Sequence, residues 1–167
     1  MGEYMKKTRI ISAFPACGKT FITEKGYEDA VILDSDSSKF SWLLDGNGEQ
    51  TTTRNPDFPA NYIEHIKENI GKVDYIFVSS HSDVRKAIDD SDFAWCCVNP
   101  SEKLMVEWVG RCYLRENTEA FIKIMVKNWD AWVQRDLSLS PCGYVTLESG
   151  EYILDKMYFI ETLTYNA

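Results

Sequence analysis

The sequence predicts a three-layer α/β fold, in which a five-stranded parallel sheet is flanked by helices. Two observations predict it. Five short apolar runs are continuously hydrophobic rather than alternating, which is typical of strands that are covered on both faces. Segments with helical periodicity separate these runs, and connections of that length join strands that lie parallel in one sheet.

The elements follow in chain order from apolar runs and turn signals. The expected strands are 8–13, 29–34, 74–79, 93–98 and 144–147. The expected helices are 19–25, 56–70, 82–88, 102–115, 118–135 and a C-terminal segment, 151–163. The helix expected over 118–135 has an apolar stripe made by Phe121, Met125, Trp129 and Trp132. The polar, turn-rich segment 46–55 is interpreted as a mobile loop.

The composition indicates one globular domain over residues 1–167, with a lid-like helical region at about 101–136. Of the 167 residues, 44% are hydrophobic and 26% are charged, which is enough apolar side chain for one core. No uncharged stretch is long enough to span a bilayer, and no signal peptide is visible near the start. We therefore expect a cytoplasmic protein with no membrane contact and no obligate protein partner.

Charge and cysteine content narrow the function classes. A net charge of −8 excludes a general nucleic-acid coat, because phosphate binding needs a basic surface, and leaves only a local basic groove. The five cysteines include no Cys-x-x-Cys pair, and there are only two histidines. We expect reduced thiols and no disulfide framework, zinc knuckle or histidine-rich metal site.

The segment A-F-P-A-C-G-K-T, from Ala13 to Thr20, carries the strongest motif. It matches the phosphate-binding loop G-x-x-x-x-G-K-[ST], except that Ala13 replaces the first glycine, and it lies between a strand and a helix. In such a loop the backbone amides form an anion nest, Lys19 reaches the β- and γ-phosphates, and Thr20 offers its hydroxyl to Mg²⁺. We interpret Cys17 as a small tolerated residue rather than a reactive thiol. The alternative is a chance match.

Two acids follow the second expected strand, in the run D-S-D-S-S. Ligands of open α/β sheets bind beyond the carboxyl ends of the strands, where these acids and the phosphate loop meet. Asp34 is expected to hold Mg²⁺ and contact substrate, and Asp36 to accept a proton from the attacking hydroxyl. This placement of D-x-D resembles the shikimate kinases, and phage polynucleotide kinases have a related acidic position. The alternative is a solvated turn that caps the next helix.

Further candidates come from the later strands and helices. The third strand ends in hydroxyls and His81 rather than in an acid, which favours a kinase over an ATPase motor. Arg111 and Arg115 share a helix face where lid arginines of simple kinases clamp phosphates, although Glu107 and Arg111 also fit an ordinary helical ion pair. The remaining candidates are Ser149 and Gly150 beside the adenine, and Ser37, Lys39, Arg54 and His81 for the substrate.

Four segments together suggest a family. The strings ISAFPACGKT, LDSDSSKFSW, RNPDFPANYI and IFVSSHSDVR resemble small P-loop kinases of bacteriophages, in particular the 5-hydroxymethyluracil DNA kinases. The resemblance spans about Arg9 to Asp155. It implies a three-layer P-loop kinase fold of the nucleoside and nucleotide kinase type, with ATP and Mg²⁺ as donor and metal. The nucleotide-binding residues would be Phe14, Pro15, Ala16, Cys17, Gly18, Lys19, Thr20, Ser149 and Gly150.

By this resemblance the protein phosphorylates the 5-hydroxymethyl group of 5-hydroxymethyluracil in DNA, with Lys19, Arg111 and Arg115 stabilising charge and Asp36 as general base. A base in a duplex must be flipped out or presented single-stranded, and Trp42 is the best candidate for stacking on it. Phe40 and Tyr62 are the weaker candidates, since aromatics at such spacing usually belong to the core. The alternatives are a kinase of free nucleotides or nucleosides, and a non-catalytic ATP-binding phage regulator.

Overall fold

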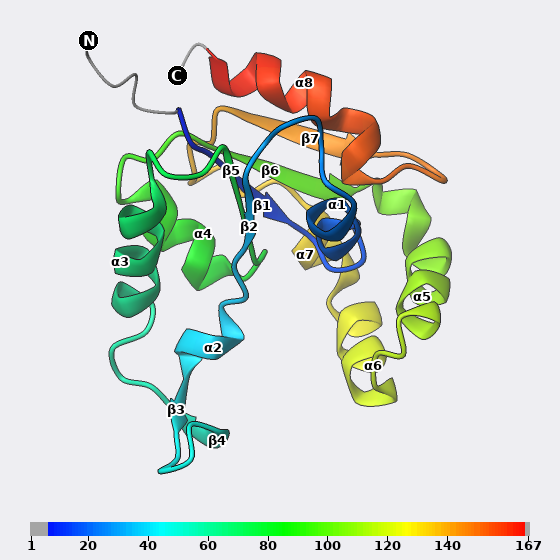
Figure 1. Ribbon diagram of the computed structural model, residues 1–167. Coiled ribbons are helices and arrows are strands. Elements are labelled where there is room, and N and C mark those ends of the chain that lie inside the picture. Colours follow the sequence, from blue (N-terminus) through cyan, green and yellow to red (C-terminus); the bar gives the residue numbers. More distant parts are fainter. Residues whose placement is uncertain (1–6, 166–167) are drawn as a thin grey trace, which may run out of the picture.

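The computed structural model describes residues 7–165, so both ends of the expected domain, 1–6 and 166–167, lie outside the described residues. A five-stranded sheet with the order β2-β5-β1-β6-β7 forms the centre (Figure 1). All of its neighbours are parallel, as the sequence predicts. The strands are β1 (Arg9–Ala13), β2 (Ile32–Asp34), β5 (Tyr75–Val78), β6 (Trp95–Pro100) and β7 (Gly143–Leu147).

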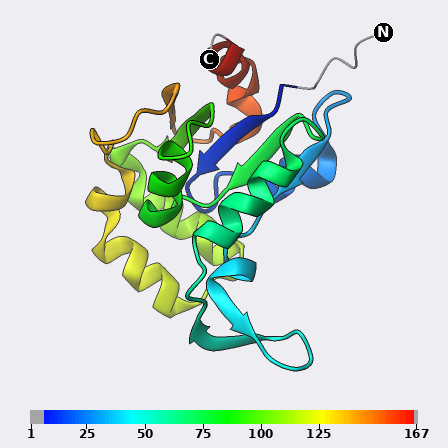
Figure 2. The same cartoon turned by 90° about the vertical axis from the view of Figure 1, so that its left-hand side faces the viewer.

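Helices cover both faces of this sheet, because successive residues of each strand point to opposite faces. On β1, Ile11 packs in a core cluster with α1 (Lys19–Lys25) and α8 (Ile153–Tyr165), whereas Ile10 packs in another with α3 (Ala60–Asn69) and α4 (Ser82–Asp89). Figures 1 and 2 show these two layers on either side of the strands. The three-layer α/β fold is therefore confirmed.

Beyond the carboxyl end of β6 the chain forms a group of short helices. A 3₁₀ turn (Glu102–Leu104) leads into α5 (Met105–Leu114), α6 (Glu119–Lys127) and α7 (Trp129–Val133). The single helix expected over 118–135 is wrong, because the chain breaks at Asn128, whose side-chain amide donates to the Ile124 carbonyl at 2.8 Å. The break changes the inner stripe, which consists of Ile122, Met125, Trp129 and Val133.

The segment expected to be a mobile loop is ordered as part of a β-hairpin. After the single turn α2 (Ser38–Ser41), β3 (Trp42–Leu44) pairs antiparallel with β4 (Gln50–Arg54), and the hairpin projects from the body (Figures 1 and 2). The Asp45 carboxylate closes the turn by accepting from the amides of Asn47 at 2.8 Å and Glu49 at 2.9 Å. The three threonines of β4 are β-branched and favour a strand although they are polar.

No helix within residues 7–165 is long and apolar enough to cross a membrane.

Candidate functional site

The phosphate-loop motif lies where the sequence predicts it, between the end of β1 and the start of α1. Two of its residues have left-handed backbone, Ala16 at φ 61° and Gly18 at φ 94°. Ala13, which replaces the first glycine of the motif, is an ordinary strand residue. The backbone conformation that a glycine adopts more easily occurs at Ala16.

The rest of the loop is buried against neighbouring elements. Phe14 and Cys17 are both 1% exposed, and the indole of Trp108 donates to the Pro15 carbonyl at 2.8 Å. Burial raises the pKa of the Cys17 thiol to about 12, so at neutral pH it is fully protonated. This agrees with the interpretation of Cys17 as a small residue rather than a reactive thiol.

Lys19 and Thr20 face the edge of the sheet at the start of α1. The Lys19 ammonium donates to the Ala13 carbonyl at 2.9 Å, and burial lowers the pKa of this ammonium. The Thr20 side chain lies close to the carboxylate of Asp34, at the end of β2, and opposes the rise of its pKa. The two residues predicted to bind metal are therefore adjacent, and a hydroxyl with a carboxylate oxygen is a donor pair that suits Mg²⁺.

A cavity of about 470 Å³ opens beside this loop, and we call it the donor cavity. Its size is in the range of small-molecule sites. Five of the predicted nucleotide-binding residues and both predicted arginines line it, together with three residues that the sequence did not single out. The lining consists of Ala16, Cys17, Gly18, Lys19, Thr20, Phe21, Arg111, Leu114, Arg115 and Tyr152.

Arg111, in the last turn of α5, and Arg115, the residue that follows this helix, differ although they are only four residues apart. Arg111 is only 7% exposed, and its guanidinium lies between the rings of Trp108 and Tyr152, 3.9 and 4.0 Å from their centroids. It also pairs with Glu107 at 2.6 Å. Arg111 is thus a fixed part of the wall rather than an arm of a moving lid, and only Arg115 is exposed to solvent.

The turn between β7 and α8 is joined to α5 by Glu107. Its carboxylate accepts from the Ser149 hydroxyl at 2.8 Å and from the Gly150 amide at 3.0 Å. The Gly150 amide is the main cause that lowers the pKa of Glu107. Ser149 and Gly150 do not line the donor cavity, where Tyr152 lies instead. The residue of this turn that lines the cavity, Tyr152, was not among the residues predicted from the sequence.

Asp34 and Asp36 lie at the end of β2, in different environments. Partial burial is the main cause that raises the pKa of Asp34, Asp36 raises it further, and Lys19 opposes both. Asp36 is exposed, and one of its oxygens accepts from the Ser38 amide at 2.9 Å. The capping role considered for Asp36 is therefore present, and its second oxygen remains available to a ligand.

A second cavity of about 240 Å³ lies beside Asp36, and we call it the acceptor cavity. It is formed by the ends of β2 and β5, the hairpin and the start of α4. Five of the predicted substrate-side residues meet here, whereas Lys39 and Asp34 do not line it. The lining consists of Asp36, Ser37, Ser38, Ser41, Trp42, Arg54, Phe58, Ser79, His81 and Asp83.

Arg54 is placed in the acceptor cavity by two aromatic rings. Its guanidinium lies 5.0 Å from the ring centroid of Trp42 and 5.3 Å from that of Phe58, and 3.7 Å from the Asp83 carboxylate. Trp42 is therefore at the cavity, as expected. Phe40 and Tyr62 instead pack against each other at 5.2 Å, which agrees with the core interpretation.

A buried hydrogen-bond network that the sequence did not reveal supports the floor of the site. The Ser37 hydroxyl donates to that of Ser79 at 2.9 Å, and Ser12 donates to the Ser79 carbonyl at 2.8 Å. Arg85, 7% exposed, donates to the Ser12 hydroxyl at 2.8 Å and to Asn99 at 2.9 Å. All of these partners of Arg85 are neutral, and the part of the chain that the structure describes forms no ion pair with it. From the sequence, Arg85 was expected only to be part of a helix, with no role in the site.

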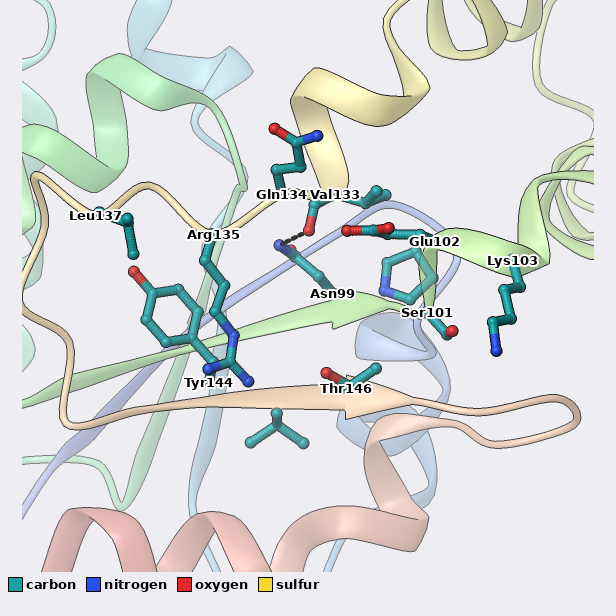
Figure 3. A pocket seen from close by; sticks show the side chains of 12 residues that line it. Asn99, Ser101, Glu102, Lys103, Val133, Gln134, Arg135, Leu137, Tyr144 and Thr146 are labelled. Carbon is teal, nitrogen blue, oxygen red and sulfur yellow. Dashed lines mark hydrogen bonds between the residues drawn. The ribbon is translucent and has the colours of Figure 1, made fainter.

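A third cavity of about 530 Å³ lies away from the phosphate loop, between β7 and the segments that lead into α5 and out of α7. Figure 3 shows Tyr144 and Thr146 of β7 on one side, the Arg135 guanidinium beside the Tyr144 ring, and Asn99 donating to the Val133 carbonyl. None of the predicted site residues lines this cavity.

Strand order, phosphate loop and flanking helices together define the P-loop kinase fold. Among solved structures the chain is similar to a gluconokinase from Sinorhizobium meliloti 1021, with a TM-score of 0.55 and 12% sequence identity, over 97% of this chain and 95% of that one. No protein-family model matches the chain, and no curated protein matches it in sequence. A likeness at this identity shows the fold, and the fold is host to many acceptors.

Proposed function

We propose that the protein is a P-loop kinase that transfers the γ-phosphate of ATP to a hydroxyl group. The observation that carries this proposal is the pair of cavities at one edge of the sheet, one beside the phosphate loop and one beside Asp36. The Asp34 carboxylate interacts electrostatically with Lys19 of the donor cavity and with Asp36 of the acceptor cavity. A donor and an acceptor could thus meet at the carboxyl ends of the strands.

The residues have the chemistry that this transfer requires. Asp36 would take the proton of the acceptor hydroxyl. The oxygen of that hydroxyl would then bond to the γ-phosphorus, while the bond between the γ-phosphorus and the bridging oxygen breaks and ADP leaves. Lys19 and Arg115 would stabilise the negative charge that spreads over the phosphoryl oxygens. Thr20 and Asp34 would hold Mg²⁺, which supplies further positive charge to the phosphates when it is bound.

We propose as acceptor the 5-hydroxymethyl group of 5-hydroxymethyluracil in DNA. This rests on the resemblance of the sequence to the phage kinases, and the wall of the acceptor cavity supports it. Trp42, Arg54 and Phe58 offer ring faces and a cation beside Asp36, which suits a flipped or single-stranded base with its phosphate. A cavity of about 240 Å³ suits one base better than a longer polymer segment.

A free nucleotide is the second candidate acceptor. The net charge of −8 favours it, because association with DNA needs a basic surface. The hairpin beside the acceptor cavity carries Asp45 and Glu49 and only one arginine, Arg54, which also disfavours a long polyanion.

Transfer of label from γ-labelled ATP with Mg²⁺ tests the proposal. Three acceptors are offered in parallel: DNA that contains 5-hydroxymethyluracil, unmodified DNA, and free deoxynucleotides. We expect label on the modified DNA alone. Label on free nucleotides would favour the second acceptor, and ATP binding without any transfer would leave a non-catalytic nucleotide-binding protein.

A further inference from the structure

We propose that the donor cavity holds the base of the nucleotide by the faces of its ring and does not read its edge, so that ATP and GTP serve almost equally. This inference rests on the proposed function, because it concerns the same nucleotide site. The inference specifies which nucleoside triphosphates the site accepts. It follows from the structure of the cavity wall opposite the phosphate loop.

Tyr152 forms a rigid aromatic surface in this wall. The Arg111 guanidinium covers one face of this ring, and its other side lies against the ring of Trp108, so the three side chains form one stack. The ring also lies against the phosphate loop, where a Cβ on Gly18 would come within 3.1 Å of Tyr152 Cδ1. Tyr152 is nevertheless 43% exposed, so a fixed ring faces the cavity.

The other groups on this side of the cavity are apolar and exposed. Phe21 of α1 is 53% exposed, and Leu114 at the end of α5 is 87% exposed. Exposed apolar side chains that converge on one cavity are typical of a surface that a flat ligand covers. Together with Tyr152 they offer contact to any aromatic base.

The backbone amides that could donate to a base edge are engaged within the protein. Along the turn after β7, the amides of Gly150, Glu151, Tyr152 and Ile153 donate in order to Glu107 Oε1, the Glu148 carbonyl, Asp155 Oδ2 and the Cys17 carbonyl. These four hydrogen bonds measure between 2.8 and 3.0 Å. No amide of this run is left to donate to N1 of adenine or O6 of guanine.

The arginine nearest to the ring is engaged in the same way. Arg111 donates to the Glu107 carboxylate at 2.6 Å, to the Glu151 carbonyl at 2.9 Å and to the Ala16 carbonyl at 3.4 Å. Lys19, Thr20 and Arg115 belong to the phosphate side of the site. Sites that discriminate strongly do so through hydrogen bonds to the edge, whereas stacking tolerates any base.

Calorimetric titration of the full chain with non-hydrolysable analogues of ATP and GTP, each with Mg²⁺, tests this inference. We expect the two dissociation constants to agree within about tenfold, because stacking on the same ring stabilises either purine. An ATP analogue that binds more than tenfold tighter than the GTP analogue would overturn it, as would the absence of binding by both. Equal binding without phosphate transfer to any acceptor would overturn the proposed kinase and leave this inference standing.

Variants of the wall give the second part of the test. Tyr152→Ala is expected to weaken both analogues by about tenfold and by the same factor, and Tyr152→Phe to retain both. Leu114→Ala, at a position too exposed to affect folding, should weaken both by a few-fold. Tyr158→Ala, on the exposed surface of α8, is the control. A loss that falls on one analogue alone would show that an edge is read and would contradict the inference.

Discussion

The donor cavity and the acceptor cavity lie at the same edge of the sheet but are built in different ways. The donor cavity rests on Trp108 and Arg111, which are 0% and 7% exposed, and on a phosphate loop that the core packs against. The acceptor cavity is closed by a hairpin that pairs only with itself among the described strands. The cavity proposed for the nucleotide is therefore built into the core, and the cavity proposed for the acceptor is completed by an element at the periphery.

Replacing Asp36 tests the acceptor side where the expected effect is largest. Asp36→Asn keeps the oxygen that accepts from the Ser38 amide but cannot take a proton, so transfer should fall by about 10²- to 10⁴-fold. Nucleotide binding should stay unchanged in calorimetry. Asp57→Asn, an exposed carboxyl on the loop before α3, is the matched control. Full activity of Asp36→Asn would exclude Asp36 as the general base.

Replacing Lys19 tests the donor side. Lys19→Ala removes the ammonium beside the phosphate loop, and we expect transfer to fall by about 10²- to 10³-fold with every acceptor. The loss should be the same for modified DNA and free nucleotides, because the donor cavity does not touch the acceptor. Lys123→Ala, an exposed lysine of α6, serves as control. Labelled-phosphate transfer measures both, and an acceptor-dependent loss would contradict the separation of the two cavities.

A substitution in the hairpin should separate the two cavities most clearly. Arg54→Gln removes the cation between Trp42 and Phe58, and we expect KM for the acceptor to rise by about tenfold while KM for ATP is retained. Steady-state kinetics with each substrate varied in turn measures the split. A rise in both constants would mean that the hairpin also shapes the donor side.

Replacing Ala16, the strained residue of the phosphate loop, is expected to have a smaller effect, which concerns the stability of the protein. Ala16 has φ 61°, a conformation that costs an L-residue about 1–2 kcal/mol, whereas a glycine adopts it freely. After the extra chain entropy of glycine is subtracted, Ala16→Gly should raise the free energy of unfolding by about 0.5–1 kcal/mol. Denaturant titration measures it. Ala120→Gly, in the exposed first turn of α6, should lower it instead.

The smallest effect concerns Cys17, in the same loop. Because burial raises the pKa of its thiol to about 12, the thiolate is nearly absent at pH 8. We expect iodoacetamide to leave Cys17 unmodified in the native protein at that pH and to react first at the half-buried Cys142. Peptide mass spectrometry locates the label. Rapid alkylation of Cys17 would show that the loop opens.

The sequence predicted the sheet and the donor side better than the acceptor side, for a physical reason. Buried strands and the phosphate loop impose hydrophobic runs and fixed residue types, which are visible in one sequence. The second strand of the hairpin, β4, is polar throughout, so it gave no apolar pattern although its threonines favour a strand. Arg85 and Tyr152 could not be found, because their positions depend on contacts across 73 residues and on the packing against Arg111.

The hairpin also bears on how such a protein can diverge. The hairpin lies in the chain between α2 and α3. At its base the Asn55 amide donates a hydrogen bond to the Ser41 carbonyl at 2.9 Å. Length and sequence between these two points can vary without loss of a single hydrogen bond of the central sheet. On the proposed function, a lineage that keeps this scaffold would exchange one acceptor for another by changing residues of the hairpin, at little risk to the central sheet.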